Sequence, residues 1–197
     1  MDYKLILAST SPRRQLLMKE AGFRFEIRTK EIEEVYPSGL AVPQIPEFLS
    51  VLKAKAFRAE LRADELLITA DTIVCIHGKA IGKPADRQGA INMLKELSGN
   101  KHTVVTGLCL TTREKQTSYS VRTDVYFRTL EEEEIVYYVD RFRPFDKAGA
   151  YGIQEWIGYV GIEKIDGSFY NVMGLPLQTL YMGLKEFGIS WKNEYNI

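Results

Sequence analysis

The sequence contains few of the residue types that build thiol-based, zinc-dependent and histidine-dependent sites. It has two cysteines and two histidines among 197 residues, too few for a disulfide framework. The same scarcity argues against a Cys/His zinc site and a Ser-His-Asp triad. Cys75 and Cys109 each lie in an apolar run rich in β-branched residues, which is typical of buried, reduced thiols rather than of a catalytic thiol.

The chain also lacks net charge, long apolar runs and a recognisable leader. Lys plus Arg and Asp plus Glu both number 26, so no bulk field holds a nucleic-acid backbone, although a few local cations suffice for a small anion. No apolar run approaches the roughly 18 residues of a membrane-spanning helix. Residues 1–9 have no basic stretch followed by a long apolar one, unlike a signal peptide. We therefore expect a cytoplasmic protein without a nucleic-acid or membrane partner.

What the sequence does contain is typical of a folded globular protein. Its residues are 45% hydrophobic and 26% charged, and its length predicts a single domain over residues 1–197. Apolar patterning predicts strands at residues 3–8, 23–29, 66–76, 102–112, 117–127 and 156–165. It predicts helices at residues 12–21, 46–62, 86–97, 131–142 and 175–187. This mixture of hairpins and crossovers indicates an α/β fold on a mixed sheet.

Two arginines stand where a strand gives way to a helix. Residues 9–14 read Ser-Thr-Ser-Pro-Arg-Arg, so Arg13 and Arg14 fall in the first helical turn, where the helix dipole favours acids instead. Backbone N–H groups at a helix start bind anions. One interpretation is an anion site that satisfies the dipole and the guanidinium groups together. The alternative is that both arginines extend over the surface into solvent.

A single carboxylate, that of Asp71, interrupts the apolar run of residues 66–74. Burying an unpaired carboxylate typically costs several kcal/mol, so Asp71 needs a compensating cation or metal, or must leave the core. The functional interpretation is a metal ligand or a general base. The alternative is an aspartate at a strand end that forms turn hydrogen bonds, although no turn residue follows within the run.

Three lysines and an acidic pair are weaker candidates. Lys83 lies in a constrained Gly-Lys-Pro loop, whereas nothing local distinguishes Lys53 and Lys147 from surface lysines. Glu33 and Glu34 lie in a polar stretch where they are able to meet a divalent cation, but a solvated acidic pair is the simpler interpretation.

The loop of residues 149–154 reads Gly-Ala-Tyr-Gly-Ile-Gln. Its glycines permit a ligand to approach the backbone closely, and Gln154 offers a donor and an acceptor on one amide. A plain structural loop explains this composition equally well.

Taken in order, these segments resemble the Maf family. The matching segments are Ser9-x-Ser11-Pro12-Arg13-Arg14, Lys53, Ala70-Asp71-Thr72, Gly82-Lys83-Pro84, residues 146–154 (Asp-Lys-Ala-Gly-Ala-Tyr-Gly-Ile-Gln) and Gly174-Leu175-Pro176. The resemblance spans about residues 4 to 187. It implies a nucleoside triphosphate pyrophosphatase with an α/β fold of the inosine-triphosphate-pyrophosphatase type, in which a long twisted mixed sheet separates two lobes around a nucleotide cleft. It also implies a homodimer and a divalent metal, most often Mg²⁺, with Mn²⁺ and Co²⁺ as alternatives.

Within this family the chain is similar to the branch that acts on dTTP and UTP, because Thr72 follows the aspartate and Gln154 follows Tyr-Gly-Ile. The branch that acts on 7-methyl-GTP differs at both places. The resemblance implies that Arg13, Thr72 and Gln154 choose the base, that Asp71 accepts a proton, and that Asp71 and Glu34 hold the metal. Other cleft residues implied by it are Ser9, Arg14, Lys53 and Lys83.

One departure concerns the lysine of the second helix. Residues 50–56 contain two Lys-Ala pairs that compete for one family position, and the spacing to Asp71 favours Lys53 over Lys55.

The implied reaction is hydrolysis of the bond between the α- and β-phosphates, which removes pyrimidine nucleotides from the nucleotide pool. CTP and modified pyrimidine nucleotides are alternative substrates. A rival function is a nucleotide-binding regulator of septum formation whose turnover is dispensable. A general phosphatase fits less well, because the sequence shows no phosphatase nucleophile motif.

Overall fold

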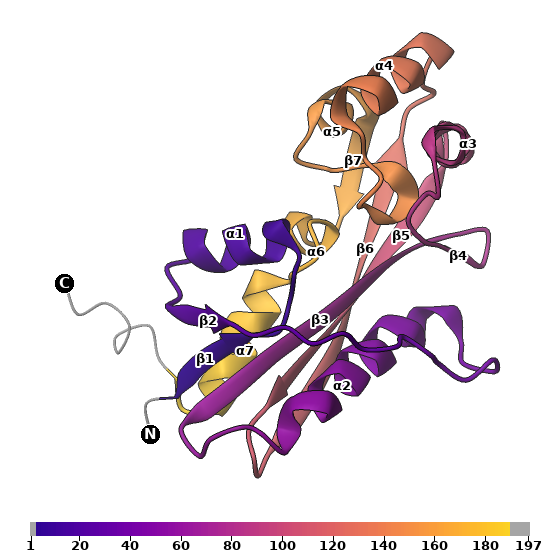
Figure 1. Ribbon diagram of the computed structural model, residues 1–197. Coiled ribbons are helices and arrows are strands. Elements are labelled where there is room, and N and C mark those ends of the chain that lie inside the picture. The colour runs from indigo at the N-terminus through magenta and orange to yellow at the C-terminus, as the bar shows by residue number, and fades with distance from the viewer. Residues whose placement is uncertain (1–2, 190–197) are drawn as a thin grey trace. The chain divides into compact units, whose positions relative to one another are not determined.

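The computed structural model describes residues 3–189 of the chain (Figure 1). Within that range one sheet has seven strands in the order β2-β1-β3-β5-β6-β7, with β4 paired to β3. The strands are β1 (Lys4–Leu7), β2 (Phe25–Ile27), β3 (Glu65–Ile76), β4 (Lys79–Ile81), β5 (Lys101–Thr111), β6 (Gln116–Phe127) and β7 (Ile162–Asp166). β1 pairs in parallel with β2 and β3, whereas β4 on β3 and β7 on β6 are antiparallel. The sheet is therefore mixed, as predicted.

Helices form where the sequence supplies starts and caps. They are α1 (Pro12–Glu20), α2 (Ile45–Arg58), α3 (Arg87–Leu97), α4 (Glu132–Phe142), α5 (Trp156–Gly161), α6 (Phe169–Val172) and α7 (Leu177–Glu186), with short 3-10 turns η1 (Val42–Gln44) and η2 (Ala148–Ala150). Pro12 begins α1, where its missing N–H costs no hydrogen bond. Asp86 caps α3 by accepting from the Gly89 N–H at 2.7 Å. Glu131 and Glu134 form a capping box at α4, which accounts for part of the acidic run there.

The chain divides into two compact units. The first comprises the described parts of residues 1–71, 106–121 and 174–197, and the second comprises residues 72–105 and 122–173. The chain passes from one unit to the other within β3, between Asp71 and Thr72, and again within β5 and β6. The expectation of a single domain over the whole chain stays a prediction.

In the first unit, α2 packs against the sheet. Ala54 and Phe57 of α2 share a buried cluster with Leu67 of β3. Burial of a side chain such as that of Phe57 stabilises the fold by about 1.5–3 kcal/mol. Gly107 of β5 permits the close approach, because a Cβ there would overlap the backbone of Pro46. This packing fixes α2 alongside the strand that carries the predicted catalytic acid.

In the second unit, α3 and α4 contact each other. Leu94 of α3 and Tyr138 of α4 are fully buried. His102 is also buried, and its Nε2 lies 2.7 Å from the Tyr151 hydroxyl. Burial lowers the pKa of His102 to about 4, so its ring is neutral at pH 7.

The structure differs from the sequence prediction at residues 156–165. These residues form helix α5 followed by strand β7, not one continuous strand. The Gly158 N–H donates to the Glu155 carbonyl at 2.9 Å, which closes the first turn of α5. Gly158 also lies so near Ile153 that a Cβ would overlap the Ile153 carbonyl oxygen. A short apolar run suits either a helix or a strand, and this close approach favours the helix.

Candidate functional site

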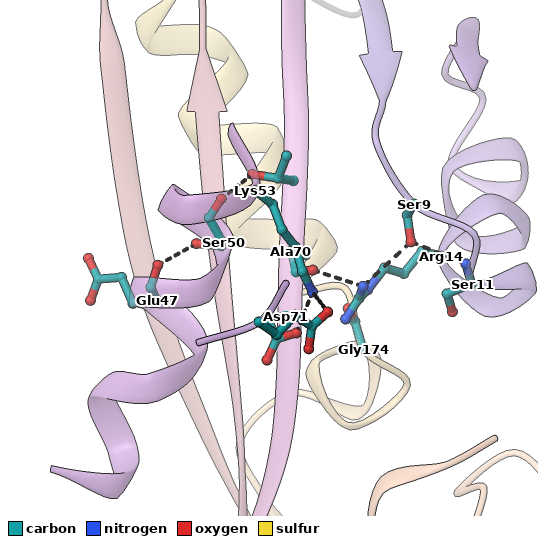
Figure 2. A network of polar contacts seen from close by, with 11 residues as sticks. Ser9, Ser11, Arg14, Glu47, Ser50, Lys53, Ala70, Asp71 and Gly174 are labelled. Atoms are coloured by element: carbon teal, nitrogen blue, oxygen red, sulfur yellow. Dashed lines mark hydrogen bonds and ion pairs between the residues drawn. The ribbon is translucent and has the colours of Figure 1, made fainter. Parts of the chain in front are cut away.

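Asp71 lies inside β3 and is only 8% exposed. Its Oδ1 accepts a hydrogen bond of 2.6 Å from Nζ of Lys53 on α2, and Figure 2 shows the two side chains directed at each other. The alternative of a strand-end aspartate in a turn is therefore wrong. The buried carboxylate is compensated by a cation, as the cost of burying a charge requires.

Lys53 also contacts a second predicted carboxylate. Its Nζ lies 2.8 Å from Oε1 of Glu34, in the loop between β2 and α2. The Lys53 side chain is 15% exposed and that of Glu34 is 52% exposed, so the group lies at the edge of the protein surface. Lys55, which competed with Lys53 in the sequence, is exposed. Lys53, Glu34 and Asp71 thus meet at one ammonium group.

Glu34 and Asp71 are the two carboxylates that the sequence analysis predicted to hold a divalent metal. Among residues 3–189 there is no cluster of three or more His, Cys, Asp or Glu side chains able to hold a metal. Mg²⁺ commonly binds through only one or two carboxylates and takes its other ligands from water and substrate phosphates. Two carboxylates that already converge on one cation, the Lys53 ammonium, fit that pattern.

Arg14 of α1 ties three segments of the first unit together. Its Nε donates to the Gly174 carbonyl at 2.7 Å (Figure 2). Its Nη1 donates to the Ala70 carbonyl at 2.9 Å and lies 3.5 Å from Oγ of Ser9. Burial lowers the pKa of Arg14, and the charge of Asp71 opposes that shift. Because Ala70 precedes Asp71, Arg14 fixes the main chain beside the predicted catalytic acid.

The start of α1 carries the other two residues of the predicted anion site. Ser9 is 7% exposed, and its Oγ accepts from the Ser11 N–H at 3.2 Å. Arg13 is half-buried, and its charge helps to lower the pKa of Arg14. The alternative in which both arginines extend into solvent is wrong for Arg14, whose guanidinium binds two backbone carbonyls.

The second unit carries the remaining predicted site residues. Thr72 follows Asp71 directly on β3 and is half-buried. Lys83 follows β4, is exposed, and forms no ion pair with any residue in the range 3–189. The neighbouring carbonyl of Gly82 accepts from the Gly149 N–H at 3.0 Å, which ties the Lys83 loop to the glycine-rich loop.

Gln154 is half-buried, yet its side-chain oxygen Oε1 is buried and has no hydrogen-bond partner in the described part of the chain. Its main-chain carbonyl accepts from the Tyr159 hydroxyl. An unpaired buried acceptor costs about 1–3 kcal/mol. A ligand that brings a donor to this oxygen would recover that free energy.

Sequence reasoning missed two residues that contact this loop, Glu155 and Tyr138. Lys147, a weak candidate from the sequence, is 8% exposed, and its Nζ lies 3.1 Å from Oε1 of Glu155. Glu155 also accepts from the Tyr138 hydroxyl. The position of Glu155 next to Gln154 was the one available clue, whereas Tyr138 has the helical spacing of an ordinary core residue.

Both cysteines are free, with Cys109 buried and Cys75 half-buried. Burial raises the pKa of both thiols, which disfavours the thiolate that a catalytic cysteine needs. The prediction of buried, reduced thiols is confirmed for Cys109, whereas Cys75 is only half-buried. Across the described residues, every helix is too short or too polar to span a bilayer.

The family model described as Maf-like protein matches residues 4–187. This chain belongs to the Maf family. The matched range includes every residue that the sequence analysis placed in the site.

Several curated proteins share about half of their residues with this chain. A protein of Bacteroides thetaiotaomicron is 56% identical over 185 residues, which cover 93% of this chain and 96% of the relative. A Porphyromonas gingivalis protein is 50% identical over 191 residues, covering 95% and 96%. A Flavobacterium johnsoniae protein is 48% identical over 179 residues, covering 91% and 92%. All three are named dTTP/UTP pyrophosphatase.

A solved structure, that of the Staphylococcus aureus Ham1 protein, is similar in fold. The TM-score is 0.55 at 14% sequence identity, and the likeness covers 93% of this chain and 99% of that chain. At this identity the likeness concerns the fold alone. It agrees with the mixed α/β architecture described above, and the predicted fold class is confirmed.

Proposed function

We propose that this protein hydrolyses dTTP and UTP between the α- and β-phosphates, giving the nucleoside monophosphate and pyrophosphate. Relatives that are 48–56% identical over at least 91% of the chain carry that activity in their names. The structural observation that carries the proposal is the buried Asp71 carboxylate bound by Lys53, next to the Ala70 carbonyl that Arg14 holds. A carboxylate among cations suits hydrolysis of an anionic phosphoanhydride, because the cations attract the substrate and the carboxylate activates water.

Local cations bind the phosphates in this proposal, because the chain has no net charge. We assign this role to Arg13, Arg14 and Lys53 of the first unit and to Lys83 of the second. As water attacks the α-phosphorus, negative charge grows on the phosphate oxygens. Guanidinium and ammonium groups stabilise that charge, which is the main catalytic contribution in phosphoryl transfer.

Asp71 accepts the proton of the attacking water. Its Oδ1 is occupied by the Lys53 hydrogen bond, so we assign the water to the other oxygen, Oδ2. The water oxygen bonds to the α-phosphorus while the bond to the bridging oxygen breaks, and pyrophosphate leaves with that electron pair. No covalent intermediate with the protein is required.

Glu34 and Asp71 are the residues that would hold a divalent metal, with Mg²⁺ as the first choice and Mn²⁺ and Co²⁺ as alternatives. Bound metal neutralises phosphate charge and lowers the pKa of coordinated water. Lys53 contributes a second positive charge beside the same carboxylates. Its long, flexible side chain allows the ammonium to exchange a carboxylate for a phosphate oxygen.

Gln154 reads the base in this proposal. Uracil and thymine present an acceptor, a donor and an acceptor along the pairing edge, and one amide matches an adjacent donor and acceptor. The buried Oε1 of Gln154 would accept from the N–H of the base. Thr72 and Arg13 complete the choice of base, and the larger size of a purine adds to the discrimination. CTP and modified pyrimidine nucleotides stay alternative substrates.

We also propose a cytoplasmic homodimer that takes a nucleoside triphosphate as its partner, with no nucleic-acid or membrane partner. The zero net charge supports the lack of a nucleic-acid partner, and the family resemblance supports the dimer. Light scattering checks the assembly: a mass near that of one chain, 22.5 kDa, would contradict the dimer.

A nucleotide panel with product identification tests the activity. In ¹⁸O-water the expected products from dTTP and UTP are pyrophosphate and a monophosphate that carries the label, because water attacks the α-phosphorus. Labelled inorganic phosphate with a nucleoside diphosphate would instead indicate a general phosphatase. Nucleotide binding without any turnover would favour the regulator.

A further inference from the structure

The side chains beside Gln154 form a connected polar network within the second unit. Lys147 is 8% exposed, and its Nζ pairs with Oδ1 of Asp146 at 2.8 Å and with Oε1 of Glu155 at 3.1 Å. A buried ammonium is tolerated only when it has such partners. Lys147 therefore holds the Glu155 carboxylate in place.

Tyr138 of α4 continues this network. It is fully buried, and its hydroxyl donates to Oε2 of Glu155 and accepts from the Gly152 N–H at 3.0 Å. Burial and the nearby Glu155 charge raise the pKa of Tyr138, so its hydroxyl keeps its proton and stays a donor. A Cβ at Gly152 would lie 2.7 Å from the Glu155 carboxyl carbon, so the loop passes too close for a side chain there.

The loop held by these contacts has a strained backbone. Ala150 has φ +56°, which residues other than glycine rarely adopt, and it follows Gly149 at φ +71°. Such a conformation persists when the surrounding structure fixes it, and it occurs preferentially at ligand sites. Here the fixing contacts are the Gly149 bond to Gly82 and the Tyr138 bond to Gly152.

Gln154 projects from the end of this loop. Ile153 before it is buried, and Glu155 after it is bound by Lys147 and Tyr138. These contacts act on the main chain, since Lys147 bonds to Asp146 and Glu155, and Tyr138 bonds to Glu155 and to the Gly152 N–H. The amide oxygen is left buried and unpaired.

The direction of this amide matters for the choice between uracil and cytosine. An amide that turns by half a rotation exchanges its donor with its acceptor. One orientation matches the carbonyl and N–H of uracil, and the other matches the amino group and ring nitrogen of cytosine. The main chain that carries Gln154 sets the place from which the amide reaches the base edge, so discrimination also depends on how firmly that main chain is held.

We propose that Lys147, Glu155 and Tyr138 are positioning residues that hold the main chain of Gln154 where its amide selects UTP over CTP. The inference rests on the proposed function, because it requires that Gln154 reads the base. The three residues act through Gln154 and leave phosphate binding unchanged.

The test is calorimetric binding of non-hydrolysable α,β-methylene analogues of UTP and CTP, which does not depend on turnover. Tyr138→Phe removes one hydroxyl, and Glu155→Gln removes a charge while keeping an acceptor for Tyr138. The matched control is Glu132→Gln on α4, whose carboxylate pairs at the surface with Lys95 at 2.6 Å. We expect the preference for UTP over CTP to fall about fivefold or more in Tyr138→Phe and in Glu155→Gln. In the control it should stay within about twofold of the wild-type value. Pyrophosphate affinity should stay within about twofold in all three.

Gln154→Ala separates the two ways in which the idea fails. If Gln154→Ala removes the preference for UTP while folded Tyr138→Phe and Glu155→Gln keep it, the positioning role is overturned. If Gln154→Ala keeps the preference, Gln154 does not read the base. Base reading by Gln154 and the positioning role are then both overturned. Tyr138→Phe and Glu155→Gln could instead lose as much pyrophosphate affinity as UTP affinity, or their urea midpoint could fall far enough to account for the loss. Either result would mean a general structural role and would overturn the proposal. Should Tyr138→Phe fail to fold, Glu155→Gln decides the question.

Discussion

The two compact units present polar side chains of different kinds. In the first unit, Lys53 bridges carboxylates and Arg14 binds backbone carbonyls, so charged groups surround Asp71. In the second unit, Gln154 presents a neutral amide with an unpaired buried oxygen. Next to that amide, the buried Lys147 ammonium pairs with the carboxylates of Asp146 and Glu155.

Under the proposed function, this difference suits the surroundings of Asp71 and of Gln154 to different parts of a nucleotide. Attraction between charges acts over several ångströms and tolerates small movements, so it suits phosphates, which all nucleotides share. A hydrogen bond depends strongly on direction, so a fixed amide suits a base. Substitutions of Asp71 and Lys53 should affect all nucleotides alike, and substitutions around Gln154 should change the choice between them.

The largest effect is expected from Asp71→Asn in the first unit. The change keeps the shape of the side chain and removes the charge that accepts a proton or binds metal. We expect kcat to fall by about 10²–10⁴-fold. Binding of a non-hydrolysable nucleotide should stay within about tenfold, a difference of roughly 1.4 kcal/mol. Steady-state kinetics and calorimetry check this. Turnover near that of the wild type would show that another residue accepts the proton, and Glu34 would be the next candidate.

A smaller but selective effect is expected from Gln154→Glu in the second unit. A carboxylate cannot donate to a base carbonyl, so UTP and dTTP should lose about 10- to 150-fold in kcat/KM. Guanine nucleotides should lose less, because a carboxylate accepts from their two neighbouring donors. The measurement is the ratio of kcat/KM for UTP and GTP. The same ratio in variant and wild type would remove Gln154 from base recognition.

Lys53→Met is expected to alter metal binding in the absence of nucleotide. The Lys53 ammonium occupies the oxygens of Glu34 and Asp71 that a metal would use. Its removal should tighten Mn²⁺ binding about tenfold, or roughly 1.4 kcal/mol, as followed by the electron paramagnetic resonance signal of free Mn²⁺. Lys79→Met, at an exposed position on β4, is the matched control. Unchanged Mn²⁺ affinity in Lys53→Met would place the metal elsewhere.

Each unit also contains a buried titratable group, and the two respond to different pH ranges. Burial lowers the pKa of His102 in the second unit to about 4 from 6.5, so the unfolded chain binds the proton first. Stability should therefore fall as pH drops from 6.5 to 4. In the first unit, the Arg28 hydrogen bonds lower the pKa of Glu65 to about 2 from 4.5. That contribution is present above pH 4.5 and is lost as pH falls toward 2.

Glu65→Gln is expected to have the smallest effect on activity and a clear effect on stability. The Glu65 side chain is fully buried between Arg28 and Arg62. The free energy of unfolding of the Glu65→Gln protein at pH 7 should therefore be lower than that of the wild type by about 3 kcal/mol. The gap to the wild type should narrow between pH 4.5 and 2, while the UTP-to-GTP ratio stays unchanged. Urea unfolding at several pH values checks this, and a gap of constant size would contradict the assigned pKa.

The parts of the structure that were predictable rest on local physics. A proline after serine marked the start of α1, and the carboxylate in an apolar strand marked Asp71 as a residue that needs compensation. The choice of Lys53 over Lys55 needed the spacing of a known family, because both lysines lie on the same helix.

The parts that were not predictable depend on contacts between distant segments. Glu155 and Tyr138 meet only because α4 packs against a loop that follows it, and neither residue type is unusual in its own segment. The helix α5 was missed because its apolar run also suits a strand. The burial of Lys147 follows from the same loop, so its sequence resembles that of a surface lysine.

The most direct test of the proposed division between phosphate binding at Lys53 and base choice at Gln154 is calorimetric binding of UTP and of pyrophosphate to two variants. Lys53→Met should weaken the binding of both ligands to a similar degree, because an ammonium group that binds phosphate is lost. Gln154→Ala should weaken UTP about tenfold or more while pyrophosphate affinity stays within about twofold of the wild type. Equal weakening of UTP and pyrophosphate by Gln154→Ala would contradict the account, because Gln154 would then serve the phosphates or the fold and not the base.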